Sequence, residues 1–566
     1  MRSSCRYTTQ EALALHESVP PDHWCVTRSD LKHLRREVLK AIENGEIGPP
    51  DDGTDDFAVS DKQYGPSIYT VNRQYIMPVT QDAGKVSWAL MRHPAGLECD
   101  LFISHAWQEG VFEFLSKVLH SWPRAARHAW CCMLANPQNL DIGALLQSPS
   151  NSPFALALQA STWVLVVPNR HCSIYTRLWC SYEAYVAHDA RKTIFVARSS
   201  NRRKICAALS QALLAGLAGV FLALAMDRWR HSWRHHVVGL VALCMVVAIA
   251  LASAALQHNG SRMALNWLGA FVSGFLTIHW YPIHGALELP GKSDELNLAE
   301  QRLLLLIAAS FFYLMEVDRV NGQSRAEEAV QLRRGFRGSI AHATCSEPDD
   351  ADRIHAEIGT QTEDVDYAIQ VLLTAGMSTP TLRDVARAGV GIQDAGHAEI
   401  AVPFLALIPF TAMSIFSFCI NFEYLPEAAW VYYVLQVYPI LCRVALLLVI
   451  SRSATDERCF IMKMMTKLVA IYLAVICPIL VQWEWYGSSG HLPDQALIDV
   501  CFYTAMCCFS FLGMRGTLAL PRCGPCLLQL FLGRCNKLPG PCAAQSSPTA
   551  TDTDSDSAGS TTTQGS

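Results

Sequence analysis

The apolar residues of this 566-residue chain are gathered in long uncharged blocks that are separated by polar stretches. Residues 205–226 contain no Asp, Glu, Lys or Arg, and the blocks at 237–256 and 401–422 are equally free of charge. A helix needs about 20 apolar residues to cross a hydrocarbon layer of ~30 Å. These three blocks therefore predict membrane-spanning helices.

Five further blocks follow the same pattern less completely. Residues 265–286 and 428–450 are long enough to span, whereas 468–483 and 500–514 need some flanking residues to do so. Residues 303–315 have a length that also suits a buried or re-entrant helix. We therefore expect eight spans in two groups of four, or seven if residues 303–315 do not cross.

The distribution of lysine and arginine predicts the orientation. Basic residues favour the cytosolic ends of spans, and the loops 423–427 and 487–495 contain none. The loop 227–236, with three arginines, is the exception. With the N-terminal region in the cytosol, the basic segments on its side are 202–204, 317–337, 452–467 and 515–537. We expect an integral membrane protein with both termini cytosolic and, because residues 1–31 are polar, no cleaved signal.

The remaining polar stretches divide the chain into expected domains. Residues 363–373 repeat apolar side chains at Val365, Ile369 and Leu372, which predicts one packed helix face. The expected domains are a helical or irregular N-terminal region (1–95), an α/β domain (96–200), a first membrane group (205–316), a helical linker domain (317–400), a second membrane group (401–520) and a cysteine-containing segment that leads into a disordered tail (521–566).

Short apolar runs alternate with helical patterns between residues 99 and 197. The runs are 99–104 (CDLFIS), 129–134 (AWCCML), 162–167 (TWVLVV) and 193–197 (TIFVA). Continuously apolar strands separated by helices predict a parallel sheet that is covered on both faces. Ligands of such sheets bind beyond the carboxyl ends of the strands. Here those ends are residues 104–107, 135–138 and 169–175.

The residues CDLFISHAW (99–107) and NRHCSIYTRLWCSYE (169–183) resemble the first strand and the third strand-to-helix turn of TIR domains. Trp179, Cys180 and Glu183 match the Trp-x-x-x-Glu element of that family. The resemblance implies a flavodoxin-like α/β fold, here followed by an all-α polytopic membrane region with an inserted helical soluble domain. The chain departs from the family at His105 and Trp107, and it lacks a convincing fifth strand and helix. The combination of SHAW (104–107), LANPQ (134–138) and RLWCSYEA (177–184) with the two membrane groups also resembles a lineage-specific protist membrane family, which implies no activity.

The resemblance implies two functions for this domain. Many TIR domains act by self-association, which implies signalling or scaffolding through other TIR-like domains or cytosolic proteins, with a possible homo-oligomer. In others the matching glutamate cleaves NAD, which implies that Glu183 is catalytic and that Trp179 stacks a ring of the substrate. His105, Trp107 and Asn136 would complete that pocket. The alternative is that Trp179 and Cys180 are core residues and that Glu183 caps the helix or pairs with Arg177 on a solvated face. We favour the non-enzymatic function, with no required cofactor and NAD only as a possible substrate.

Polar residues within or beside the spans support a third function, a transporter or channel with a regulatory TIR-like domain. Arg443 lies inside a span, and Asp499 and Glu484 lie near span edges. Ionisable residues in membrane segments are functional candidates by default. Arg443 pairs with Asp499 in this hypothesis, whereas the alternative is that its side chain reaches the headgroups.

Composition excludes several other classes. The chain is 51% apolar and only 17% charged, and its net charge of −5 offers no basic footprint for nucleic acid. Cys523 and Cys526 have the spacing of a thioredoxin motif but follow a span, and a zinc site with Cys535 and Cys542 has unremarkable spacing. We therefore expect no metal. Reversible acylation or interfacial packing suits these cysteines better, and the lipid bilayer is the expected partner.

Overall fold

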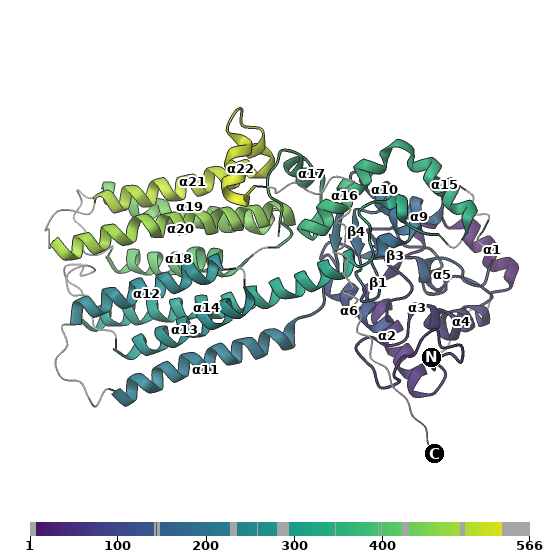
Figure 1. Cartoon of the computed structure of the whole chain (residues 1–566), viewed down its shortest axis with the longest axis horizontal. Coiled ribbons are helices and arrows are strands. Elements are labelled where there is room, and N and C mark those ends of the chain that lie inside the picture. Colours follow the sequence, from purple (N-terminus) through teal and green to yellow (C-terminus); the bar gives the residue numbers. More distant parts are fainter. Residues whose placement is uncertain are drawn as a thin grey trace, which may run out of the picture.

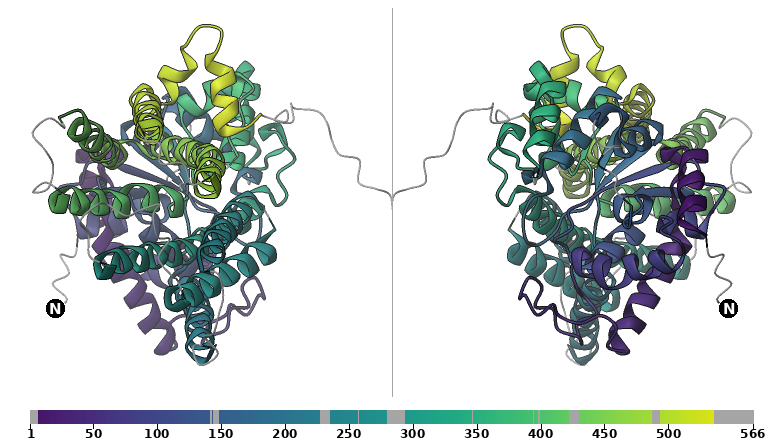
Figure 2. Two further views of the ribbon diagram at one scale, coloured as in Figure 1. Left: turned by 90° about the vertical axis from the view of Figure 1, so that its left-hand side faces the viewer. Right: turned by 90° about the vertical axis from the view of Figure 1, so that its right-hand side faces the viewer.

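The structure is a computed structural model that describes residues 7–140, 143, 148–226, 235–256, 258–279, 294–345, 347–393, 395–397, 399–421, 430–486 and 493–534. Figure 1 shows an α/β head from which a bundle of long helices extends. The two end-on views show the bundle projecting from the head along the long axis (Figure 2). The predicted tail, Cys535 and Cys542, and nearly all of the loop 227–236 lie outside the described residues.

The head is built on a mixed six-stranded sheet in the order β1-β3-β2-β4-β5-β6. Neighbouring strands from β3 to β5 are parallel, and the edge strands β1 and β6 are antiparallel. Each of the four predicted apolar runs therefore contains a parallel strand, although the second half of the run 129–134 forms a short helix. The strands are β1 (Val26–Thr27), β2 (Leu101–Ser104), β3 (His128–Cys131), β4 (Trp163–Val166), β5 (Thr193–Val196) and β6 (Met377–Ser378).

Helices cover both faces of this sheet, as continuously apolar strands require. The apolar side chains divide into two clusters, one that contains Phe102 and Val164 and one that contains Ile103 and Leu165. Alternate residues of a strand thus pack on opposite faces. The described α-helices of the first 200 residues are α1 (Thr9–Ser18), α2 (Arg28–Glu43), α3 (Ile68–Val71), α4 (Met77–Asp82), α5 (Trp88–Arg92), α6 (Val111–Ser121), α7 (Cys132–Ala135), α9 (Pro153–Ala160) and α10 (Leu178–Asp189).

Residues 340–378, in the stretch expected as a separate linker domain, pack on the sheet of the head. The helices α15 (Pro348–Ile358) and α16 (Thr362–Ala375) pack against α10, and Ile354 and Ile369 share one apolar core with the sheet. β6 follows α16 and precedes α17 (Pro380–Arg387). It covers the edge of β5 with the pairs Ile194–Ser378 and Phe195–Met377. The head is therefore discontinuous, because four bundle helices are inserted between β5 and these elements.

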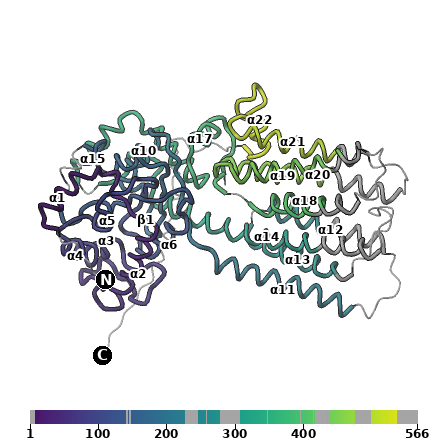
Figure 3. The backbone as a smooth tube through the Cα atoms, turned by 180° about the vertical axis from the view of Figure 1, so that it is seen from behind, coloured from purple at the N-terminus to yellow at the C-terminus, as the bar shows by residue number. Residues whose placement is uncertain are grey.

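The bundle consists, within the described residues, of eight long helices in two groups. In Figures 1 and 3 the first group lies together beside the second. The first group is α11 (Arg202–Met226), α12 (His235–Ala255), α13 (Asn259–His279) and α14 (Asp294–Arg333). The second group is α18 (Ala401–Asn421), α19 (Trp430–Arg452), α20 (Thr455–Tyr486) and α21 (Pro493–Leu518), followed by the short α22 (Gly524–Leu532).

Two helices of the described residues are long and apolar enough to cross a membrane by length and hydropathy. They are α11 and the part of α21 from Ile498 to Leu518. The apolar helical stretches Met245–Ala255 and Ala401–Ala412 are shorter. Helix α14 differs most from expectation, because it continues for 40 residues from the bundle into contact with the head.

Small residues let α11 and α13 approach closely. A Cβ atom on Gly219 would lie 2.1 Å from the carbonyl oxygen of Phe271, and one on Gly274 would lie 2.2 Å from that of Gly216. Close backbone contact of this kind is how helices associate where no water drives them together. The opposite side of α11 exposes large apolar side chains, among them Leu214 and Phe221.

We expect Gly219→Val to separate α11 from α13 and to lower the stability of the protein by about 1–3 kcal/mol or more, as overpacking does. The measurement is the unfolding temperature of the full-length protein in detergent. Ala218→Val is the matched control, because Ala218 is the neighbouring residue and is exposed. Equal unfolding temperatures for the two variants would contradict the close packing of α11 on α13.

Candidate functional site

Glu183 is tied into the interior of the head. Glu183 is 7% exposed, and Ser104 Oγ at the end of β2 donates a hydrogen bond of 2.5 Å to Glu183 Oε2. Burial raises the pKa of Glu183 to about 8, although the Ser104 bond and the charge of Arg177 oppose the shift. The alternative in which Glu183 lies on a solvated face is therefore wrong.

His105, the next residue after Ser104, is also buried. Its Nε2 lies 3.2 Å from Cys132 Sγ and its Nδ1 lies 3.3 Å from Glu109 Oε1. Burial lowers the pKa of His105 to about 3, with a further contribution from Arg177, and burial raises the pKa of Glu109. The imidazole is thus neutral, and neither carboxylate oxygen of Glu109 has a hydrogen-bond partner among the described residues.

Trp107 and Arg177 lie beside this buried group. Trp107 Nε1 donates to Cys132 Sγ at 3.2 Å, and its ring centre is 5.4 Å from that of Tyr69. Arg177 Nη1 donates to the Tyr69 hydroxyl at 3.1 Å and to Gln108 Oε1 at 3.3 Å. The structure therefore brings Glu183, His105 and Trp107 to the same end of the sheet.

Among the described residues, the hydrogen bonds and ring contacts of Trp179 and Asn136 are not with Glu183, His105 or Trp107. Trp179 stacks on Phe154 with ring centres 5.3 Å apart, and its Nε1 donates to Asp350 Oδ2 at 3.3 Å. Trp179 thus packs against α9 and α15, as expected if it is a core residue. Asn136 follows α7, is 4% exposed, and its Oδ1 has no hydrogen-bond partner among the described residues.

The sequence reasoning missed Glu109 and Cys132 as members of this buried group. Cys132 lies in the apolar run AWCCML, where a thiol is expected to pack like a small apolar side chain. Glu109 follows Ser104 by five residues in a polar turn, which gave no reason to place it inside. The signal that could have found Glu109 is its position beyond the carboxyl end of a buried strand.

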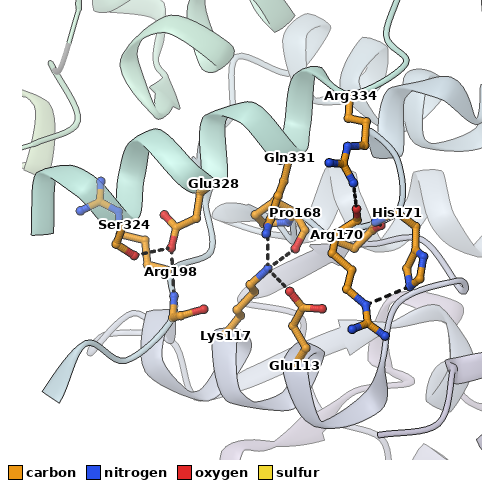
Figure 4. Close-up of polar contacts among 12 residues, drawn as sticks. Glu113, Lys117, Pro168, Arg170, His171, Arg198, Ser324, Glu328, Gln331 and Arg334 are labelled. Carbon is orange, nitrogen blue, oxygen red and sulfur yellow. Dashed lines mark hydrogen bonds and ion pairs between the residues drawn. The ribbon is translucent and has the colours of Figure 1, made fainter. Parts of the chain in front are cut away.

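Helix α14 docks on the head through a buried lysine (Figure 4). Lys117 Nζ donates to Glu113 Oε1 at 2.8 Å, to Gln331 Oε1 of α14 at 3.1 Å and to the carbonyl oxygen of Pro168. Lys117 is 2% exposed. Its charge is therefore neutralised by Glu113 within the head and shared with α14.

Two further contacts fix the same helix. The backbone N–H of Ser199 donates to Glu328 Oε1 at 3.1 Å, and Arg334 donates to the carbonyl oxygen of Arg170 (Figure 4). A cavity of about 110 Å³ lies beside this contact, between β5, α14 and α16, with Arg198, Arg325 and Glu328 in its lining. Neither Glu183 nor Ser104 lines that cavity.

Arg443 lies inside the second helix group. Its Nη1 donates to the carbonyl oxygen of Phe410 at 3.0 Å and to Ser414 Oγ at 2.7 Å, and its guanidinium lies 4.6 Å from the ring centre of Tyr503. Asp499 instead accepts a bond of 2.7 Å from the Tyr472 hydroxyl. The expected Arg443–Asp499 ion pair is absent from the described residues, and with 7% exposure Arg443 does not extend into the surroundings. The Glu484 side chain lies outside the described residues.

No family model matches the chain, and no curated protein or solved structure does so. Within the described residues no group of three or more His, Cys, Asp or Glu side chains is placed to hold a metal ion. The functional argument therefore rests on the geometry of the chain itself.

We expect Glu183→Gln to change the dependence of stability on pH. Because the native state holds the Glu183 proton up to about pH 8 and an unfolded chain releases it near pH 4.5, the wild-type protein loses stability as the pH rises between these values. Glutamine cannot ionise, so the stability difference in favour of the variant grows by up to about 1.4 kcal/mol per pH unit in this window. Unfolding temperatures from pH 5 to 9 measure it.

The control is Glu327→Gln, because Glu327 is an exposed carboxylate of α14. It removes one charge and leaves the interior of the head unchanged. The same pH slope for wild type and Glu183→Gln would show that Glu183 is not a buried protonated group.

Proposed function

We propose that the chain is a multi-pass integral membrane protein that presents a TIR-like head to the cytosol and acts in signalling or scaffolding by protein association. The order of its parallel strands, β3-β2-β4-β5, supports the TIR-like assignment. Numbered within the parallel set, it is the 2-1-3-4 order of flavodoxin-like sheets. The antiparallel β6 is a departure from that pattern.

The bundle supports the membrane part of the proposal. Its helices run side by side away from the head, and α11 turns Leu214 (65% exposed) and Phe221 (67% exposed) outward. Such side chains are costly in water and favourable in lipid. The first turns of α13 and α20, which contain Arg262 and Arg458, lie at the head end, where the positive-inside rule places a cytosolic face.

The contacts of helix α14 with the head are the main support for the signalling function. A single helix of 40 residues joins the bundle to the head, and its last turns bind Lys117 and Ser199 directly. A shift of α14 in the membrane therefore moves residues that contact α6 and the end of β5. Association partners on either side of the membrane could use this connection.

Cleavage of NAD is the second candidate, and one observation favours it. Ser104, His105 and Glu183 meet at the carboxyl ends of β2 and β4, beside the point where the strand order reverses. Open α/β sheets bind ligands at this point. Against it, Glu183 Oε2 already accepts from Ser104, and the described cavity lies elsewhere. The third candidate, transport, is supported by the enclosed Arg443 of the second helix group.

Membrane extraction tests the main proposal. Two differently tagged copies of the full-length protein are co-expressed, and the membranes are washed with alkaline carbonate. We expect both copies to stay in the pellet because apolar helices hold them in lipid, and to purify together after mild solubilisation. Release into the supernatant would contradict the membrane assignment. Retention without co-purification would remove self-association and leave heterologous partners.

Nicotinamide release from NAD separates association from catalysis. We expect the purified full-length protein to release nicotinamide no faster than Glu183→Gln does, because the carboxyl group is buried and bonded to Ser104. The release is followed by chromatography at high protein concentration. A wild-type rate well above that of the variant would establish the enzyme in place of the scaffold.

A further inference from the structure

Helix α22, the short helix that follows α21, lies at the end of the bundle that faces the head (Figure 1). Its inner side is built into the second helix group, where Leu528 and Phe531 are buried. The Phe531 ring makes edge-to-face contacts with Phe460 of α20 and Phe509 of α21, with ring centres 6.4 Å and 5.0 Å apart. These contacts fix α22 beside the start of α20 and the last turns of α21.

The end of α22 is also bound to the segment that follows α17. The backbone N–H of Gly391 donates to the carbonyl oxygen of Gly533 at 2.7 Å, and Gln529 Nε2 donates to the carbonyl oxygen of Gly389 at 3.4 Å. Because α17 comes directly after the edge strand β6, α22 connects this part of the head with the second helix group.

The outer side of α22 presents two thiols and a leucine. Cys523 and Cys526 are exposed and free, and Leu530 is 57% exposed. Residues with the spacing i, i+3 and i+7 lie in one stripe along a helix. The two thiols therefore do not pack into the described part of the chain, and they share their side of the helix with a large apolar side chain that points outward.

The surroundings of this stripe suit the boundary between lipid headgroups and hydrocarbon. Residues 515–534 contain three arginines and no Asp or Glu. Arg522 and Arg534 are exposed at the two ends of α22, and Phe511 of α21 is 67% exposed close to the contact of α21 with α22. A helix with outward apolar side chains and flanking cations is typical of segments that lie in a membrane interface.

We propose that Cys523 and Cys526 are S-acylated with long-chain fatty acyl groups. The acyl donor is a long-chain acyl coenzyme A. The cysteine sulfur attacks the thioester carbonyl carbon, a new C–S bond forms, the bond to the coenzyme A sulfur breaks, and the thiol proton passes to that sulfur. No atom is oxidised or reduced. The inference rests on the proposed membrane function, because the acyl chains need lipid beside α22.

The acylated helix would anchor a defined part of the head. Two acyl chains bind a membrane stably, whereas one gives only marginal binding. Because the Gly389 and Gly391 bonds tie the segment after α17 to α22, the acyl chains would hold this segment at the membrane surface. Since thioesters are cleaved by hydrolysis, this anchor is reversible, unlike a membrane span.

Acyl exchange on the full-length protein, expressed in eukaryotic cells, tests the proposal. Free thiols are blocked with N-ethylmaleimide under denaturing conditions, and thioesters are then cleaved with neutral hydroxylamine. The released thiols are coupled to a maleimide polymer that slows the protein on a gel. We expect one hydroxylamine-dependent addition fewer than in wild type for Cys523→Ser and for Cys526→Ser, and two fewer for the double variant. Cys508→Ser, which removes an exposed thiol within α21, should behave as wild type.

Equal numbers of additions in wild type and in the double variant would overturn the proposal. Alkaline carbonate extraction of the same membranes separates this failure from that of the proposed function. Retention of the protein without the expected loss of additions would refute acylation alone. Release of the double variant while wild type is retained would support acylation and refute the multi-pass assignment, because acyl chains alone would then hold the protein. Release of both proteins would refute the membrane function and the acyl anchor with it.

Discussion

The pairing of β6 with the edge of β5 constrains the whole molecule. The chain leaves the head after β5, forms four long helices and must return through α14 before Met377 can pair with Phe195. The parallel part of the sheet therefore exposes one edge until the first helix group is in place, and exposed edges are prone to wrong pairing. Completion of the head thus depends on the bundle. This dependence makes the two parts one mechanical unit.

The contact between α14 and the head is polar at its centre, which has consequences for energy and specificity. A buried ion pair such as Lys117–Glu113 contributes little net stability, because both charges lose their hydration. Loss of one partner is costly, because the other charge stays buried and unpaired. Since Lys117 also binds Gln331 of α14 and the carbonyl oxygen of Pro168, only one position of α14 satisfies it. The lysine therefore selects how α14 sits on the head.

Much of the architecture could be predicted from the sequence, for identifiable reasons. The four parallel strands are continuous apolar runs, and long uncharged blocks such as residues 205–226 are recognisable as helices by length alone. β6 could not be found, because two residues carry no periodicity. The full length of α14 was missed because the half that docks on the head is polar. The spacing of Trp179 and Glu183 placed both on α10 but did not reveal that one contacts α15 and the other Ser104.

The head contains two buried groups of polar residues, one around Glu183 and one around Lys117. They differ in the hydrogen-bond and ionic partners that the chain supplies to them. At Glu183 the structure already supplies a donor, Ser104, and burial favours the neutral carboxyl, so little charge is left for a ligand to meet. At the contact with α14 the head instead buries a charge, the ammonium of Lys117, which donates to Glu113, Gln331 and the carbonyl oxygen of Pro168. The chain therefore satisfies both groups itself, one through a neutral carboxyl and the other through an ion pair. Because the ion pair also binds α14, any movement of this helix relative to α6 disturbs a buried charge, whereas the group at Glu183 has no such link to the bundle.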